Sequence, residues 1–301
     1  MIYGQTIFIE LTNICNFNCI YCPYYQDKKE KGFIKLELIN KIVKDLEKIE
    51  FIEIVTLSAL GEAILHPNIF EICKHLKSNK YKLFLSTNGS RLNSNHLDLD
   101  IDIMRISLET LTSEAFNLRN ADCSFEEYIN NIKDFLKIWN GKYKIFISIM
   151  LNDKSDLFDY NSFLNSGNEN DAKLVNDFFK EIFPNFHILE KDIKPGKVIE
   201  IVPNLQLHFR QIEYSNFIDY EPDITIEELD SQIECRLYRN HINISYDGIV
   251  RSCCMDVNHE LVIGNIKEQS LKEIIDKRGD NINVSNNPLC RRCKGIKKRV
   301  I

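Results

Sequence analysis

The chain has 301 residues, 44% of them hydrophobic and 10% aromatic, which is enough apolar side chain for one large domain and a smaller one. Its net charge of -6 disfavours attraction to phosphate backbones, so we expect no nucleic-acid partner. No segment approaches the ~18 to 20 apolar residues of a membrane span, and no basic region followed by an apolar run marks a secretion signal. We therefore expect a cytoplasmic protein with no membrane partner.

Strands and helices alternate from the start of the chain to about residue 195. β-branched and apolar runs predict strands over Thr6–Thr12, Glu53–Ala59, Lys82–Asn88, Ile103–Glu109, Lys144–Leu151 and Phe186–Lys191. Helical periodicity predicts helices over Leu36–Glu50, Asn68–Ser78, Phe125–Trp139 and Ala172–Ile182. This alternation predicts an α/β fold with a parallel sheet. Six βα units are too few to close an eight-stranded barrel, so we expect a partial (β/α)6 parallel barrel.

Polar residues gather where the predicted strands end, which is where parallel α/β folds bind ligands. They are Cys15, Cys19 and Cys22 after the first strand, Gly61 and Glu62 after the second, Thr87 to Gly89 after the third, and Ser107 and Glu109 on the fourth. Alternation along a strand places Arg105, Ser107 and Glu109 on one face. Glu10 and Thr12 likewise share a face of the first strand. We expect these faces to line a reaction chamber.

Three cysteines follow the first strand with the spacing Cys15-x3-Cys19-x2-Cys22. Three thiolates leave one iron of a 4Fe-4S cluster without a protein ligand. That iron can bind the amino and carboxylate groups of S-adenosylmethionine and pass an electron into its sulfonium. A zinc site would require a fourth protein ligand, and none is near in the sequence.

The run from Glu10 to Cys22 resembles the radical S-adenosylmethionine superfamily, including the aromatic Tyr21 before the third cysteine. The resemblance implies that Tyr21 packs near the adenine and that the Gly61-Glu62 backbone holds the methionyl amino group. The flanking Leu60 and Ala63 depart from the commoner Gly and Pro of the family. The resemblance also places several residues around the ribose and the methionyl carboxylate: Ser86, Thr87, Asn88, Gly89, Ser107 and Arg119. For a general base, the sequence leaves open Glu109, Glu190, Asp192 or none of these residues.

Two polar segments interrupt the second half of the chain. Residues Asn152 to Asp171 are rich in Asn, Asp and Ser, which predicts a surface loop or lid. A second loop is predicted over Glu213 to Glu234. We place the domain boundary between residues 195 and 200, with the barrel over residues 1–195 and a second domain over 196–301. The basic tail that begins at Arg291 is expected to face solvent.

The C-terminal region carries five of the ten cysteines of the chain. Cys235 precedes a predicted hairpin, His241–Val250, whose turn at Asp247-Gly248 is typical of a two-residue loop. Cys253 and Cys254 follow it, then a helix from about Ser270 to Arg278, then Cys290 and Cys293. Four thiolates from this set could hold a second 4Fe-4S cluster or a structural zinc ion. The two isolated cysteines, Cys73 and Cys123, are expected to be structural.

This region resembles the SPASM and Twitch domains of radical S-adenosylmethionine enzymes, from Cys235 through Asp247-Gly248 and Cys253-Cys254 to Cys290 and Cys293. The resemblance implies a small α+β domain. It also implies one auxiliary 4Fe-4S cluster held by Cys235, Cys253, Cys290 and Cys293, with Cys254 as a neighbour of the ligands.

Together the two resemblances imply an oxidoreductase that removes a hydrogen atom from a small polar, sugar-like or alcohol-like molecule. A reducing partner such as flavodoxin or ferredoxin would supply the electron. Cys15 leaves no room for a leader-binding domain before it, which favours a small molecule over a peptide. The alternatives are a maturase that modifies a ribosomal peptide or a protein side chain, and a non-catalytic iron-sulfur protein for electron transfer or sensing.

Overall fold

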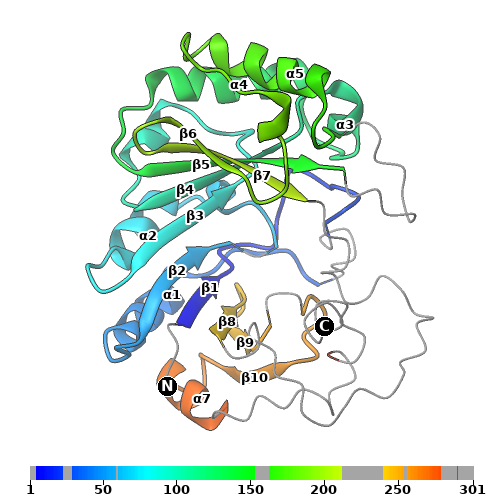
Figure 1. Cartoon of the computed structure of the whole chain (residues 1–301). Coiled ribbons are helices and arrows are strands. Elements are labelled where there is room, and N and C mark those ends of the chain that lie inside the picture. Colours follow the sequence, from blue (N-terminus) through cyan, green and yellow to red (C-terminus); the bar gives the residue numbers. More distant parts are fainter. Residues whose placement is uncertain are drawn as a thin grey trace, which may run out of the picture. The chain divides into compact units, whose positions relative to one another are not determined.

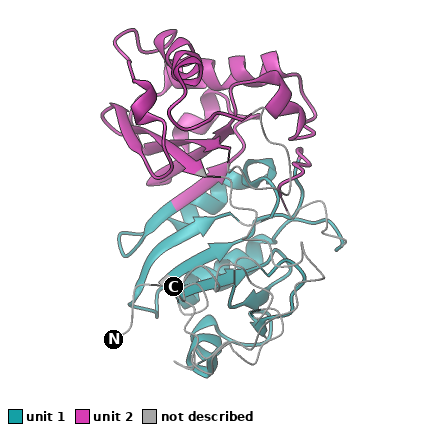
Figure 2. Cartoon of the chain, turned by 45° about the vertical axis from the view of Figure 1, so that its right-hand side comes forward, with its two compact units in different colours: residues 1–15, 23–83, 214–301 teal, residues 16–22, 84–213 magenta. Residues whose placement is uncertain are grey.

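The computed structural model describes residues 5–22, 29–58, 60–152, 163–211, 240–253, 256–278 and 290 (Figure 1). The chain folds into two compact units (Figure 2). Unit 1 consists of residues 1–15, 23–83 and 214–301, and unit 2 consists of residues 16–22 and 84–213. Each unit therefore combines segments that are distant in the sequence.

In unit 1, the first strand of the chain pairs with the C-terminal hairpin. β1 (Gln5–Ile9) is parallel to β2 (Ile52–Leu57) on one side and to β8 (His241–Ile244) on the other. β9 (Ile249–Arg251) is antiparallel to β8, and β10 (Val262–Asn265) is antiparallel to β9. The strand order in this unit is thus β10-β9-β8-β1-β2.

Three helices accompany these strands: α1 (Leu36–Leu46), α2 (Ile69–Leu76) and α7 (Leu271–Arg278). The buried residues of α1 recur at three- and four-residue steps, as expected for a helix with one apolar face. Asp45 is buried on α1 and its carboxylate accepts a hydrogen bond of 2.8 Å from the backbone N–H of Leu271. This bond joins the start of α7 to α1. A 3₁₀-helix, η2 (Ala63–Leu65), follows β2.

Unit 2 contains four parallel strands and one antiparallel strand. β3 (Lys82–Thr87) enters the unit at Phe84 and pairs with β4 (Ile103–Glu109), which pairs with β5 (Lys144–Leu151). β5 pairs in parallel with β7 (Leu205–Gln211), and β6 (Val198–Val202) is antiparallel to β7. The connecting elements are η3 (Ser94–Asp98), α3 (Ser113–Asn117), α4 (Phe125–Ile138), α5 (Glu169–Lys180) and η4 (Glu190–Asp192).

The two faces of the unit 2 sheet differ in chemistry. One face is a fully buried apolar core that includes Met104, Ile106, Ile145, Ile147, Leu205 and Leu207. Helix α4 covers this face, because a Cβ atom on Gly89 would lie 3.0 Å from the Ile106 side chain and 3.1 Å from Ile132 of α4. The other face, here called the polar face, presents Arg105, Ser107, Phe146, Ser148, Gln206, His208 and Arg210.

The first five predicted strands are confirmed, but the sixth, at Phe186–Lys191, is wrong. The Asn176 side chain donates to the Ile188 carbonyl and accepts from the Ile188 N–H, at 2.9 Å each. The hydrogen-bonding groups of the Ile188 backbone are thus paired with a side chain. We had expected them to pair with a neighbouring strand. The sixth parallel strand along the chain is instead β7. The sheet of unit 2 therefore continues past the predicted boundary at residue 195.

The predicted hairpin and helix of the C-terminal region are confirmed, but the hairpin turn is longer than expected. The N–H of Ser245 donates to the carbonyl of Ile249 at 2.9 Å, which leaves residues 246–248 in the turn. Gly248 has a φ of 91°, a conformation that glycine adopts without strain. The predicted loop over 213–234, the basic tail and residues 153–162 of the predicted lid lie outside the described residues.

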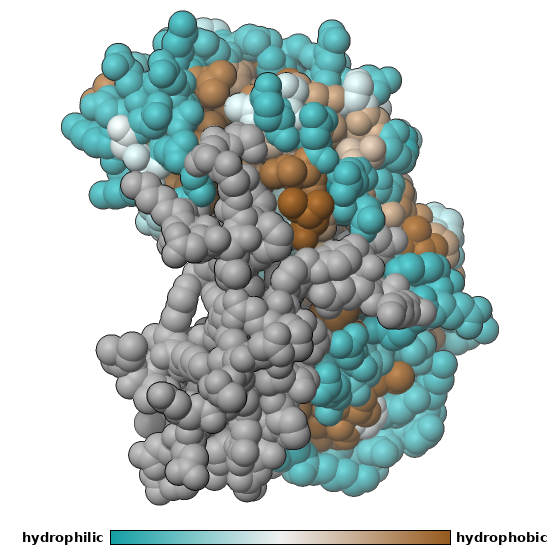
Figure 3. All heavy atoms as spheres, turned by 90° about the vertical axis from the view of Figure 1, so that its right-hand side faces the viewer, coloured by the Kyte–Doolittle hydropathy of each residue, from teal (hydrophilic) through white to brown (hydrophobic). Residues whose placement is uncertain are grey.

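On the face shown in Figure 3, hydrophilic side chains cover most of the described surface, with smaller apolar areas between them. The exposed large hydrophobic side chains of the described residues are Phe33, Phe70, Ile138, Leu174, Leu189, Val198 and Val262. Single exposed apolar residues of this kind are usual on folded proteins. None of the helices in the described ranges is both long and apolar enough to cross a membrane.

Candidate functional site

The segment that carries Cys19 and Cys22 is fastened to the loop after α3. The N–H of Asn18 donates to the Arg119 carbonyl at 3.1 Å, and the N–H of Ile20 donates to the Leu118 carbonyl at 3.0 Å. The N–H of Cys22 in turn donates to the Cys19 carbonyl at 3.0 Å. These backbone bonds give the cysteine loop a defined conformation.

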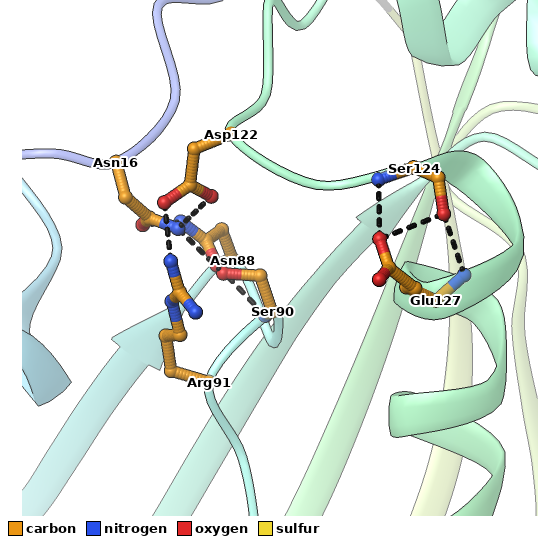
Figure 4. A network of polar contacts seen from close by, with 7 residues as sticks. All are labelled: Asn16, Asn88, Ser90, Arg91, Asp122, Ser124 and Glu127. Carbon is orange, nitrogen blue, oxygen red and sulfur yellow. Dashed lines mark hydrogen bonds and ion pairs between the residues drawn. The ribbon is translucent and has the colours of Figure 1, made fainter.

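Asn16, which directly follows Cys15, is the centre of a polar network in unit 2 (Figure 4). Its amide nitrogen contacts Ser90 Oγ and Asp122 Oδ1, each at 2.9 Å. Its carbonyl oxygen accepts from the Asn88 amide at 3.0 Å, and Arg91 pairs with Asp122. Asn88, predicted to lie near the ribose and the methionyl carboxylate, is thereby linked to the cysteine loop.

In unit 1, Gly61 and Glu62 contact the segment just before Cys15. The N–H of Glu62 donates to the Ile14 carbonyl at 2.8 Å. Gly61 has a φ of 80°, and a Cβ atom there would lie 2.3 Å from the Thr12 carbonyl oxygen. Glycine is therefore required at this position. The Glu62 side chain is buried and accepts from the N–H of Ile64 at 3.2 Å, capping η2.

Arg119 is a buried cation beside the cysteine loop. Its Nη1 donates to the Leu108 carbonyl at 3.0 Å and to the Tyr128 hydroxyl at 2.6 Å, and its guanidinium lies 4.7 Å from the centre of the Phe17 ring. Burial acts to lower the pKa of Arg119, but the neighbouring Tyr128, Tyr21 and acidic groups outweigh it and the pKa is raised. Arg119 is therefore charged at neutral pH, as a residue that binds a carboxylate must be.

Tyr21, the aromatic residue before the third cysteine, is held in an apolar setting. Its ring meets the ring of the buried Phe163 edge-on, with 5.9 Å between centroids. Burial raises the pKa of the Tyr21 phenol well above its ordinary value, and Cys19 and Glu109 add to this. The phenol is thus neutral, and the ring offers a flat apolar surface.

Tyr128 on α4 was not anticipated from the sequence, although it lies among the predicted site residues. Its hydroxyl is within 3.0 Å of the Asn88 carbonyl and 3.1 Å of the Ser107 carbonyl. It thus joins the ends of β3 and β4. A tyrosine on the apolar side of an amphipathic helix carries no sequence signal that separates it from a core residue.

Glu109, at the end of β4, combines backbone strain with an unsatisfied buried oxygen. Its φ is 62°, which is rare for a residue other than glycine. Its Oε1 accepts from Ser148 Oγ at 2.9 Å, while Oε2 is buried and has no hydrogen-bond partner among the described residues. A buried carboxylate oxygen of this kind is suited to accept a hydrogen bond from a bound molecule.

The two other candidates for a general base differ from Glu109. Glu190 is exposed on η4. Asp192 accepts from the N–H of Leu189 at 3.0 Å and lies 3.3 Å from Lys197 Nζ, and the first of these contacts lowers its pKa. Asp192 therefore has a local structural role as the cap of η4.

In the C-terminal region, Cys253 and Cys290 are buried, and neither forms a disulfide with another described residue. Cys235, Cys254 and Cys293 lie outside the described residues, so their assignments stay predictions. Buried polar atoms with no hydrogen-bond partner in the described structure lie just before Cys253 and on the adjacent strand β8: Ser252 Oγ, Arg251 Nε, and Asn243 Oδ1 and Nδ2. Polar hydrogens near Cys253 that lack a partner in the described structure could donate hydrogen bonds to the sulfur atoms of an iron-sulfur cluster.

Cys15, Cys19 and Cys22 lie partly exposed on one loop, and none of them forms a disulfide with another described residue. Their donor chemistry fits a 4Fe-4S cluster with one open iron. Over the described ranges, however, no three His, Cys, Asp or Glu side chains are gathered closely enough to hold a metal ion. The structure thus places the predicted ligands of the first cluster on one anchored loop and does not bring their sulfurs into ligating geometry.

Glu10 does not line a chamber as expected but forms a buried ion pair in unit 1. Its Oε2 lies 3.7 Å from Arg251 Nη2, and both side chains are 2% exposed. The Glu10 N–H also donates to the Ile244 carbonyl at 2.8 Å. The end of β1, which leads to Cys15, is therefore coupled to the hairpin that leads to Cys253.

Two cavities in the described structure lie at the amino ends of strands. One is lined by residues 50–53 and 79–82, before β2 and β3, and the other by residues that include Gly141, Val202 and Pro203, before β5 and β7. Ligands of parallel α/β folds bind at the carboxyl ends. Within each unit, the candidate residues lie instead where strands end: Gly61 and Glu62 follow β2 in unit 1, and Asn88 and Glu109 lie at the ends of β3 and β4 in unit 2.

Comparison with known proteins identifies two matching families along the chain. The model of the radical SAM superfamily matches residues 9–158, and that of an iron-sulfur cluster-binding domain, SPASM, matches residues 235–294. Together these two matches span most of the chain.

Two curated relatives illustrate the range of similar proteins. A tungsten-containing aldehyde ferredoxin oxidoreductase cofactor-modifying protein of Pyrococcus furiosus is 28% identical over 109 residues, 35% of this chain and 31% of the relative. A probable GTP 3',8-cyclase of Methanocaldococcus jannaschii is 25% identical over 91% of this chain and 95% of the relative. In the first four curated relatives, the match spans 31% to 59% of the relative's length.

Among solved structures, SuiB of Streptococcus suis bound to the precursor peptide SuiA superposes with a TM-score of 0.58. The two chains are 14% identical, and the match covers 99% of this chain and 71% of that one. At this level of identity the likeness concerns the fold, an α/β architecture with an open and largely parallel sheet.

Proposed function

Because the chain belongs to the radical S-adenosylmethionine superfamily and carries a C-terminal SPASM iron-sulfur domain, we propose that it abstracts hydrogen from a small polar substrate. Its cofactors are S-adenosylmethionine, the 4Fe-4S cluster that binds it, and further iron-sulfur in the C-terminal domain. When bound, these cofactors would supply a 5′-deoxyadenosyl radical, with one electron from a flavodoxin or ferredoxin and methionine as the second product, and this radical would take the substrate hydrogen atom.

The observation that carries this proposal is the anchored three-cysteine loop. We assign Cys15, Cys19 and Cys22 as the ligands of the first cluster. The loop carries three thiols at the predicted spacing, and it is held by the backbone bond from Asn18 to Arg119 and by the side-chain bonds of Asn16. On the other side of Cys15, the Ile14 carbonyl is held by the N–H of Glu62.

The residues around this loop are suited to hold the remainder of S-adenosylmethionine. The flat, neutral ring of Tyr21 suits an adenine, and the charged Arg119 suits the methionyl carboxylate. Gly61, Glu62, Asn88 and Ser107 are assigned to the methionyl amino group and the ribose.

We assign Cys235, Cys253, Cys290 and Cys293 to one auxiliary 4Fe-4S cluster. In an oxidation, this cluster would supply the acceptor for the substrate electron, and a protein base would take the proton. Glu109 is the favoured base, because its buried Oε2 lacks a partner in the described structure. Glu190 and Asp192 are disfavoured by their exposure and capping contacts.

The small size of the proposed substrate is supported by the probable GTP 3',8-cyclase, which matches 91% of this chain. Its name describes a reaction on a nucleotide, which is a small, polar and phosphorylated molecule. We propose a sugar-like or alcohol-like substrate of comparable size, and a peptide substrate is the alternative outcome of the test below.

The S-adenosylmethionine chemistry is tested with anaerobically reconstituted protein and dithionite. The wild type should form 5′-deoxyadenosine and methionine, and the triple variant C15A/C19A/C22A should form neither. Iron should fall from about eight to about four atoms per chain, because each cluster is held separately. The C123A variant, which removes a cysteine outside both sets, should retain both iron and turnover. Unchanged turnover in the triple variant would falsify the assignment.

The substrate class is tested with deuterated metabolites and, separately, with peptides encoded near the gene. Mass spectrometry of the 5′-deoxyadenosine formed reports which compound donates hydrogen. Deuterium from a sugar-like or alcohol-like metabolite supports the proposal. Deuterium arriving only from a peptide contradicts the small-molecule substrate and leaves the radical chemistry intact.

A further inference from the structure

The polar face of unit 2 carries two arginines without a carboxylate at ion-pair distance. Arg105 lies on β4, and its Nε donates to Ser86 Oγ at 3.0 Å. Arg210 lies on β7, opposite Met150 of β5, and is exposed. Across the described parts of the chain, neither guanidinium forms a salt bridge. Arginines that serve only the fold are usually paired with an acid when they lie inside a domain.

His208 adds a third nitrogen-bearing side chain to the same face. It lies on β7, two residues before Arg210 and opposite Ser148 of β5. Ser148 in turn lies opposite Ser107 of β4. The register of the three strands therefore brings Arg105, His208 and Arg210 to one side of the sheet, around its two central serines.

The electrostatics of this face show an excess of positive charge. Burial and, to a smaller extent, the charge of Arg210 lower the pKa of Arg105 to about 10, while Glu109 opposes the shift. Burial also lowers the pKa of His208, together with Arg210, Arg105 and Lys144. Like charges in such proximity destabilise one another unless an anion lies between them.

Aromatic rings pack on two of the three side chains, Arg105 and His208. The Phe146 ring packs on the His208 imidazole with 4.6 Å between centroids and an interplanar angle of 30°. The Arg105 guanidinium lies 5.9 Å from the centre of the Phe84 ring, and Lys144 Nζ lies 5.7 Å from that of Phe146. Side chains packed in this way lose little further freedom when a ligand binds.

We propose that Arg105, His208 and Arg210 form a subsite for an oxyanion of the substrate, either a carboxylate or a phosphate. The subsite rests on the proposed function and narrows its substrate class from polar to anionic. A guanidinium binds either oxyanion through two parallel N–H···O bonds, and the Nη atoms of Arg105 are free of hydrogen bonds to described residues. A neutral or cationic substrate would form no charge-assisted pair with the two guanidinium groups.

The subsite is tested by isothermal titration of the reconstituted holoenzyme in the presence of S-adenosylmethionine. The probes are pyrophosphate for a phosphate group and succinate for a carboxylate. We expect at least one probe to bind, and R105Q and R210Q each to weaken it about tenfold or more, since a hydrogen bond to a charged group contributes about 1.5–3 kcal/mol. R210K should retain part of the affinity, because it keeps the charge and loses the two-pronged geometry.

The matched control is K173Q, which removes a positive charge from the exposed face of α5 and should leave probe binding unchanged. Circular dichroism and iron content verify that each variant is folded and loaded. The inference is overturned if neither anion binds the wild type, or if R105Q and R210Q bind as the wild type does. Wild-type protein that binds the anion without cleaving S-adenosylmethionine would instead refute the proposed function and leave the subsite standing.

Discussion

Gly61 and Gly141 have nearly the same backbone conformation in different surroundings. Their φ values are 80° and 79°. A Cβ atom on Gly61 would lie 2.3 Å from the Thr12 carbonyl oxygen and 2.8 Å from that of Ile14, whereas nothing lies within 4 Å of one on Gly141. Substitution of Gly141 therefore measures the cost of a side chain on a left-handed backbone alone. Substitution of Gly61 measures that cost together with the cost of a steric clash.

We expect G141A to lower the free energy of unfolding by about 1–2 kcal/mol, the cost of a side chain in the left-handed region. G61A should lower it by about 2–5 kcal/mol, because overpacking against backbone oxygens is added. Urea unfolding monitored by circular dichroism measures both. Equal losses in the two variants would show that the segment before Cys15 yields to the added methyl group, contrary to the close packing described here.

At the scale of the element, α4 begins with a reciprocal pair of contacts. Ser124 Oγ accepts from the Glu127 N–H at 3.2 Å, and the Glu127 carboxylate accepts from the Ser124 N–H at 2.8 Å (Figure 4). This capping box positions the helix that carries Tyr128. The bond from the Ser124 N–H, followed by that from its hydroxyl, lowers the pKa of Glu127.

A carboxyl group whose pKa is lower in the folded state stabilises the fold above its unfolded pKa, and this contribution is lost as pH falls through its folded pKa. We therefore expect E127Q to have a lower Tm than wild type at pH 7, and the difference to vanish in acid, where Glu127 is protonated and resembles Gln. The control is E126Q in the same helical turn, which should change Tm less. Thermal unfolding over a pH series measures this, and a difference that persists unchanged into acid would contradict it.

At the scale of the whole molecule, the ion pair between Glu10 and Arg251 joins residues near the two ends of the chain within unit 1. Arg251 also donates to the Asp256 carbonyl. The Asp256 carboxylate accepts from the backbone N–H groups of Glu260 and Leu261, at 2.9 and 2.7 Å. The loop after Cys253 is therefore organised around the same arginine that faces β1.

We expect R251M to lower the free energy of unfolding by about 3–5 kcal/mol, because it leaves the Glu10 carboxylate buried without its cation. The double variant E10Q/R251M should recover part of the loss. K272M, which removes an exposed pair with Asp276, should cost no more than about 0.5 kcal/mol. Denaturant unfolding of the full chain tests all three. A loss in R251M as small as that in K272M would mean that the pair does not join β1 to the hairpin.

Local patterns predicted most of the fold. The strand over Ile103–Glu109 has the predicted bounds, and α4 ends one residue before the predicted end. These predictions succeed because hydrophobic periodicity and helix caps depend on residues that are close together in the sequence. The strand predicted at Phe186–Lys191 was wrong because the contact that prevents it comes from Asn176 on another element. No property of the run itself indicates that contact.

For the site, the sequence by itself determined the chemistry. The cysteine spacing, Tyr21 and Gly61-Glu62 predicted the radical S-adenosylmethionine superfamily, which the family comparison confirms, because ligand type and spacing on one loop are local properties. Only the tertiary structure decided that Glu10 pairs with Arg251 instead of lining a chamber, and that Arg105 shares a face with His208 and Arg210. These pairings depend on which strands are neighbours and in what register, and register is set by the packing of the whole sheet.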